Sequence, residues 1–218
     1  DFYWFEKIGE YIFLAVADCT GHGVPGAMVS VVCSNALNKA VIEEDLSDPG
    51  KILDRVTHLV EGKFSTNADV RDGMDICLCR INTNTYELAF AGAYNPVYIL
   101  EKLTDESLAE KFRNEEYWVR EIKADKQPIG HYEDRKNFMT HNYQLSKDQI
   151  IYLFSDGYYD QFGGVRGKKY KAANFKRLLL KIHEKVGSDQ RTILDTTIDD
   201  WKGDFEQVDD ICVIGVRV

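Results

Sequence analysis

The 218-residue chain is predicted to form one α+β domain, residues 1–218, with a mainly antiparallel sheet. Runs of β-forming residues occur in pairs separated by short turns, which is typical of hairpins. Helical patterns follow the first pair of runs, and two more precede the last run. Because strands and helices do not alternate one by one, the order does not fit a Rossmann-type parallel sheet.

The N-terminal part begins with a hairpin, whose strands are expected at residues 2–5 and 11–17. A turn rich in glycine follows, and Pro25 favours a helix start at that point. The pair Asp48 and Pro49 is a good cap and first turn for a second helix. The apolar face of the first helix is expected to comprise Ala27, Val31, Val32, Leu37 and Val41.

The rest of the chain is expected to contain a second hairpin, further strands and a C-terminal pair of helices. Residues 101–126 are rich in charge and poor in pattern, and they are predicted to form a mobile or helical excursion. The expected strands are residues 74–81, 86–91, 97–100, 137–144, 149–154 and 211–218, and the expected helices are 174–182 and 190–201.

Composition limits the function classes. The net charge is −9 and no basic stripe is present, which disfavours nucleic acid as a partner. No apolar run is long enough to insert in a membrane, and no secretory signal is seen. The five cysteines lie in apolar segments without zinc-ligand spacing, so they are predicted to be core thiols of a cytoplasmic protein.

Four aspartates stand at predicted strand ends. Asp1 and Asp18 would meet at one end of the first hairpin, and Asp156 and Asp209 would meet if their strands are antiparallel neighbours. Clustered carboxylates need cations, and oxygen ligands select hard ions, so we expect two Mg²⁺ or Mn²⁺ ions. Such a pair can activate a bridging water and clamp a phosphoryl group. Taken singly, each aspartate could instead be a turn or cap residue.

Six segments resemble the metal-dependent protein phosphatases of the protein phosphatase 2C class, and in particular the bacterial subgroup of stage II sporulation protein E. The longest is VADCTGHGVPGA at residues 16–27. The others are DFY at 1–3, AGAYNP at 91–96, QPIG at 127–130, SDG at 155–157 and DDI at 209–211. A single SDG is a weak signal, whereas several motifs in the same order form a specific one.

The resemblance implies two stacked antiparallel sheets, a β-sandwich flanked by helix pairs, with metals at one edge. It implies that Asp18 bridges both ions and that the backbone carbonyl of Cys19 completes one coordination sphere. By the same resemblance, Asp1 serves one ion, and Asp156 and Asp209 serve the other. The substrate would be a phosphoserine or phosphothreonine in a protein, which in this subgroup is typically an anti-sigma-factor antagonist.

Three points stay open in the sequence. His22 could act as general acid to the leaving oxygen, or it could pack the helix entry. Tyr94 stands where the subgroup often has histidine. The abrupt start at Asp1 suggests an upstream sensor or coiled-coil region that dimerises the parent protein, which could be membrane-linked. The alternatives to a protein phosphatase are a catalytically weak domain that binds a partner, and a phosphohydrolase of small molecules.

Overall fold

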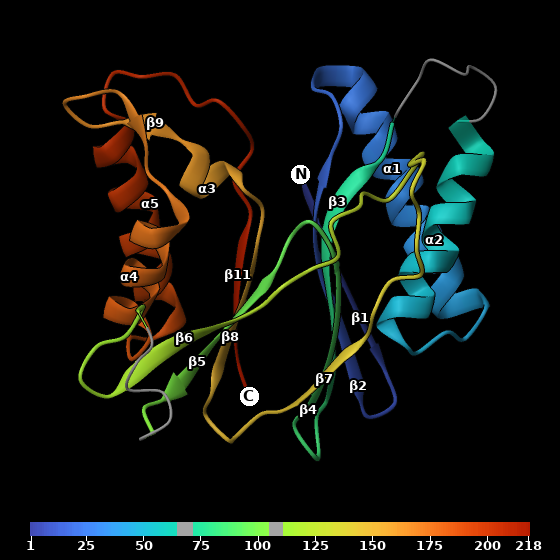
Figure 1. Ribbon diagram of the computed structural model, residues 1–218, viewed down its shortest axis with the longest axis horizontal. Helices are drawn as coiled ribbons and strands as arrows, with labels where there is room; N and C mark the ends of the chain where they lie inside the picture. The colour runs from blue at the N-terminus through green and yellow to red at the C-terminus, as the bar shows by residue number, and fades with distance from the viewer. Residues whose placement is uncertain (65–71, 105–110) are drawn as a thin grey trace.

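The computed structural model describes residues 1–64, 72–104 and 111–218. Two antiparallel sheets stack face to face, and a pair of helices covers the outer face of each sheet (Figure 1). The prediction of an α+β sandwich flanked by helix pairs is confirmed. The N-terminus lies near the upper end of the sheets in this view.

The first sheet has five strands in the order β1-β2-β3-β4-β7, and neighbouring strands are antiparallel. It contains both hairpins that the sequence predicts, because short polar turns join β1 to β2 and β3 to β4. Its strands are β1 (Phe2–Ile8), β2 (Tyr11–Cys19), β3 (Met74–Asn82), β4 (Glu87–Ala93) and β7 (His141–Gln144).

The second sheet has four strands in the order β11-β8-β5-β6, again antiparallel. The central strand β8 is buried along its whole length, as expected for a strand covered on both faces. The strands are β5 (Val97–Lys102), β6 (Tyr117–Ile122), β8 (Ile150–Phe154) and β11 (Val213–Arg217).

The helices form the two outer layers. Helix α1 (Gly23–Asn38) continues into a π-helical turn, η1 (Lys39–Glu43), and α2 (Pro49–Phe64) packs beside it on the first sheet. Helices α4 (Ala172–Ile182) and α5 (Gly187–Lys202) cover the second sheet. Short elements connect these layers: α3 (Gly157–Asp160), β9 (Phe162–Gly163) and β10 (Lys168–Lys169).

The buried side chains of the described residues form three clusters that correspond to the interfaces between layers. One lies under α1 and α2, one lies between the sheets, and one lies under α4 and α5. Leu53, Leu153 and Leu179 represent these clusters, and each is fully buried. Burial of such a side chain contributes roughly 1.5–3 kcal/mol, so packing on both faces stabilises each sheet.

Two sequence predictions are wrong in part. Residues 117–122 of the supposed excursion form β6, which pairs with β5 along its length; residues 105–110 of it lie outside the described part. The buried residues Trp118 and Val119 are adjacent and do not alternate with polar ones, so the segment carries no clear strand pattern. The buried face of α1 also differs from the predicted one. Val31 is exposed and Val29 is buried, because this helix is apolar on several sides and its periodicity is ambiguous.

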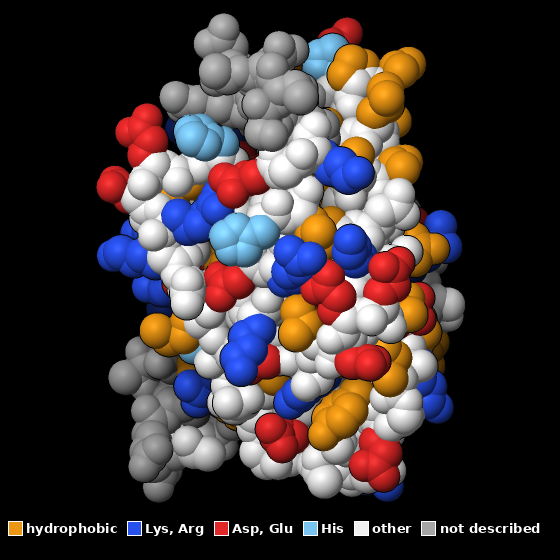
Figure 2. All heavy atoms as spheres, turned by 90° about the vertical axis from the view of Figure 1, so that its right-hand side faces the viewer, with side chains coloured by type: hydrophobic (Ala, Val, Ile, Leu, Met, Phe, Trp, Pro, Cys, Tyr) orange, Lys and Arg blue, Asp and Glu red, His pale blue; other side chains and the backbone are white. Residues whose placement is uncertain are grey.

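The outer face of the α1–α2 layer mixes charged and hydrophobic side chains, and the hydrophobic ones gather at the upper right of Figure 2. Exposed hydrophobic residues of α1 are Val24, Met28 and Val31. Of the helices in the described ranges, none is both long and apolar enough to span a bilayer.

Candidate metal centre

A lateral row of residues crosses the end of the first sheet. Asp18 is paired with Asp75 of β3. Phe2 is paired with Ala17, so Asp1 precedes β1 opposite Asp18, and the pairing of Ile76 with Ala93 carries the row on from Asp75 toward Tyr94. Cross-strand partners in an antiparallel sheet point to the same face. Three aspartates from distant parts of the chain are therefore adjacent in this row.

The second sheet brings two more aspartates to the same end. Asp156 follows β8 and Asp209 precedes β11, and these strands are antiparallel neighbours as the sequence analysis required. Ser155 fixes the two segments together, since its N–H donates to the Cys212 carbonyl and its hydroxyl accepts the Cys212 N–H at 3.0 Å each. Carboxylate oxygens of Asp18, Asp156 and Asp209 all lie within 4.8 Å of one another.

The pKa values of the carboxyl groups in this cluster reflect burial and repulsion between like charges. Burial, together with the charges of the nearby carboxylates of Asp156, Asp209 and Asp75, raises the pKa of Asp18 to about 7. Burial and the charges of Asp160 and Asp209 also raise the pKa of Asp156. Carboxylates held this close repel one another when both are ionised, and a bound cation would offset that repulsion.

Buried oxygen atoms without partners also fit a cation. Oδ2 of Asp1 and Oδ1 of Asp156 are buried, and neither has a hydrogen-bond partner among the described residues. The Asp1 side chain is only 7% exposed, while the α-amino group of Asp1 donates to Oδ2 of Asp210 at 2.9 Å. An unpaired buried carboxylate oxygen is costly, and oxygen-only groups suit Mg²⁺ or Mn²⁺. The residues present therefore fit divalent cations.

The glycine-rich turn after β2 places the other predicted site residues. Cys19 ends β2, and its side chain is buried with that of Cys33 in the cluster under α1, so a role for Cys19 in binding an ion would fall to its backbone carbonyl. His22 is exposed at the N-cap position of α1, and its side chain makes no capping hydrogen bond. A Cβ on Gly26 would lie 2.7 Å from the Gly21 carbonyl oxygen, which explains the glycine there.

Sequence reasoning missed Asp75. The available signal was an aspartate at the start of the strand that pairs with the strand of Asp18. The sequence analysis did not assign a partner to β2, so this signal was not used.

The position of the QPIG segment at 127–130 is also explained by the structure. Met74 and Ile129 exchange backbone hydrogen bonds of 3.0 and 2.9 Å, so the QPIG segment at 127–130 lies against the strand start beside Asp75.

The raised pKa of Asp18 predicts an unusual pH dependence for the metal-free protein. In the unfolded chain Asp18 ionises near 3.8, and in the folded chain near 7. Its contribution to stability is present below the unfolded pKa and is lost as the pH rises through the folded pKa. We expect thermal unfolding of metal-stripped protein at pH 5 and pH 8 to show this loss, and Asp18→Asn to reduce it. An equal pH dependence in both proteins would contradict the assignment.

Comparison with known proteins supports the same class. The sequence model described as stage II sporulation protein E matches residues 9–218. No curated protein matches the chain in a direct comparison.

Solved structures share the fold. The SiaA-PP2C domain of Pseudomonas aeruginosa has a TM-score of 0.84 and 25% identity, over 100% of this chain and 80% of that one. The SpoIIE PP2C phosphatase domain of Bacillus subtilis has a TM-score of 0.74 and 16% identity, over 99% of this chain and 57% of that one. The RsbU and RsbW domains of Rv1364c from Mycobacterium tuberculosis have a TM-score of 0.68 and 19% identity, over 99% of this chain and 55% of that one. The chain therefore belongs to the stage II sporulation protein E family, and it is a phosphatase domain of the PP2C class, the class of serine/threonine phosphatases.

Proposed function

We propose that the chain hydrolyses phosphoserine or phosphothreonine in a regulatory protein, using two divalent cations, Mg²⁺ or Mn²⁺. The ligands would be carboxylates of the four aspartates at the sheet ends and the Cys19 carbonyl. The observation that carries this proposal is the approach of the Asp18, Asp156 and Asp209 carboxylates to within 4.8 Å. Carboxylates so close together repel one another unless cations lie between them. The ligands proposed are Asp1, Asp18, Cys19 through its carbonyl, Asp156 and Asp209.

The chain's own groups have separate tasks in this mechanism. When bound, the ions would lower the pKa of a shared water and stabilise charge on the phosphoryl oxygens. Asp18, central in the row, would bridge the ions, while Asp1 on the first sheet and the Asp156–Asp209 pair on the second would each fix one of them. His22 is the proposed general acid for the leaving serine oxygen, and its exposure leaves the ring accessible to a substrate.

The relatives support a choice of substrate class. One similar structure contains RsbU and RsbW domains, and another is the cell fate determinant SpoIIE. We therefore propose a phosphorylated anti-sigma-factor antagonist or a similar small regulatory domain as substrate, in the cytoplasm.

Metal removal tests the proposed function. We expect the purified chain to release phosphate from a phosphoserine peptide in Mn²⁺ or Mg²⁺, and EDTA to abolish turnover, because the carboxylates alone cannot activate water. Phosphate release is the measurement, and excess Mn²⁺ added after EDTA is the control for reversible loss. Turnover that persists in EDTA would reject the mechanism. A folded, metal-bound chain without turnover on any phosphoprotein would favour a partner-binding role.

A further inference from the structure

The row across the first sheet contains one carboxylate that the proposed ligand set does not use. Asp75 stands between Asp18 on β2 and Tyr94 after β4. It is half-buried, and its side chain shares a face with that of Asp18. Cβ atoms of such cross-strand partners lie about 4.5–5.5 Å apart, so the two carboxyl groups are close neighbours.

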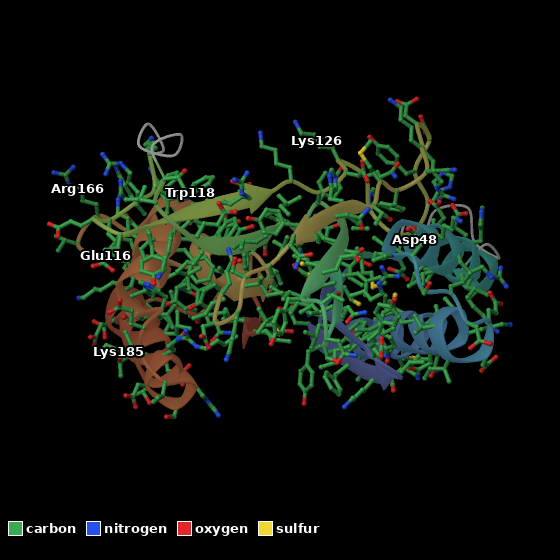
Figure 3. The ribbon with its side chains drawn as sticks, turned by 90° about the horizontal axis from the view of Figure 1, so that it is seen from below. Asp48, Glu116, Trp118, Lys126, Arg166 and Lys185 are labelled. Carbon is green, nitrogen blue, oxygen red and sulfur yellow. The ribbon has the colours of Figure 1, made fainter. Side chains whose placement is uncertain are left out.

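The described residues supply no hydrogen-bond or ion-pair partner for the Asp75 carboxylate. Within the ranges that the structure describes, the Asp75 carboxylate has no ion pair and accepts no hydrogen bond. The charge that acts on it is another carboxylate, that of Asp156. Lys126 follows the segment that pairs with Tyr94, but it is exposed and projects outward from the protein (Figure 3). A half-buried carboxylate among other carboxylates is costly without a cation.

Structural aspartates in the same protein look different. Asp54 and Asp125 are also half-buried, but each accepts a backbone N–H, from Phe138 at 2.9 Å and from Met139 at 2.8 Å respectively. Among the residues that the structure describes, none donates such a hydrogen bond to Asp75. Its position is therefore better explained by something outside the chain than by the stability of the fold.

A second observation points to a cation at this row. At the opposite end, the Asp1 side chain is 7% exposed, and its Oδ2 has no partner among the described residues. Asp75 itself is not part of the group whose oxygens lie within 4.8 Å, which comprises Asp18, Asp156 and Asp209. From a position beside this group, its carboxylate can reach an ion through one bound water.

We propose that Asp75 is a positioning residue of the metal centre, whose carboxylate accepts hydrogen bonds from water bound to the cations that Asp18 and Asp156 hold. The inference rests on the proposed function, since it assumes cations at these aspartates. Outer carboxylates of this kind orient the groups around a metal and increase the affinity for it; their loss typically costs about 10–100-fold in affinity or activity.

The test is calorimetric titration of the metal-stripped 218-residue chain with MnCl₂, together with thermal unfolding of the metal-free protein. We expect Asp75→Asn to weaken Mn²⁺ binding by about 10–100-fold. We also expect it to raise the metal-free unfolding temperature, because it removes charge repulsion. Asp75→Ser repeats the test without an amide that could pair with Asp156. Asp125→Asn is the matched control and should bind Mn²⁺ as the wild type does, because its side-chain oxygen can still accept the Met139 N–H.

The outcomes separate this inference from the proposed function. Wild-type Mn²⁺ affinity in both Asp75 variants, with binding lost in Asp18→Asn, would overturn the role of Asp75 and leave the metal centre intact. A lower metal-free unfolding temperature in both Asp75 variants would also overturn it, since that is the effect of losing a structural residue. A folded wild-type chain that binds no Mn²⁺ would reject the proposed function and this inference with it.

Discussion

Replacement of Asp18 by asparagine is expected to reduce Mn²⁺-dependent phosphatase activity by at least about 100-fold. Mutation of residues that only contact the ligands of a metal already lowers affinity or activity by about 10–100-fold. Asp18 occupies the centre of the row, and its carboxylate lies within 4.8 Å of those of Asp156 and Asp209. An asparagine keeps the size of the side chain but offers one neutral oxygen, so it cannot bridge two cations.

The measurement is phosphate release from a phosphoserine peptide over a range of Mn²⁺ concentrations. The metal-free variant should unfold at a higher temperature than the wild type, because the burial and repulsion that raise the pKa of Asp18 no longer act on a charge. Gain of stability together with loss of activity distinguishes a metal ligand from a structural residue.

Asp54→Asn is the matched control. Asp54 is half-buried and burial raises its pKa too, but it accepts the Phe138 N–H and stands outside the group formed by Asp18, Asp156 and Asp209. Its asparagine variant should keep wild-type activity. Full activity in Asp18→Asn would reject the bridging role, and equal losses in both variants would show that activity tracks a general change in charge or stability.

The order of hairpins and helices could be predicted from the sequence because each hairpin has a local signal. Turn residues separate β1 from β2 and β3 from β4, and Pro25 and Pro49 mark helix starts. Strand β6 was missed because its buried residues, Trp118 and Val119, are adjacent within a charged segment, and its pairing with β5 spans a connection that has no local signal.

The candidate site was predictable only in part, for the same physical reason. Asp1 and Asp18 are joined by a hairpin, so their proximity follows from local pairing. The approach of Asp156 to Asp18 depends on how two sheets stack, and the sequence indicated it only through the family resemblance. Asp75 needed the pairing of β2 with β3, which are separated by two helices. Nonlocal pairing leaves no periodic pattern in the chain.

The glycine after Asp156 shows how closely the backbone sets this geometry. Gly157 is buried, and a Cβ built on it would lie 1.9 Å from the Asp210 carbonyl oxygen and 3.4 Å from Cβ of Asp209. The first distance is far inside van der Waals contact, and the obstacle is backbone rather than a flexible side chain. Gly157→Ala must therefore push the segment of Asp209 and Asp210 away from Asp156.

We expect Gly157→Ala to weaken Mn²⁺ binding and activity and to destabilise the protein by about 3 kcal/mol, the upper end for overpacked sites. For a chain of this size, that corresponds to a fall of about 6–12 °C in unfolding temperature. Gly62→Ala is the control, because a Cβ at this exposed position of α2 meets nothing within 4 Å. It should stabilise the helix by about 0.5–1 kcal/mol and leave Mn²⁺ binding unchanged. Native stability and Mn²⁺ affinity in Gly157→Ala would show that the spacing of Asp156 and Asp209 tolerates backbone movement, and that the ions do not depend on their close approach.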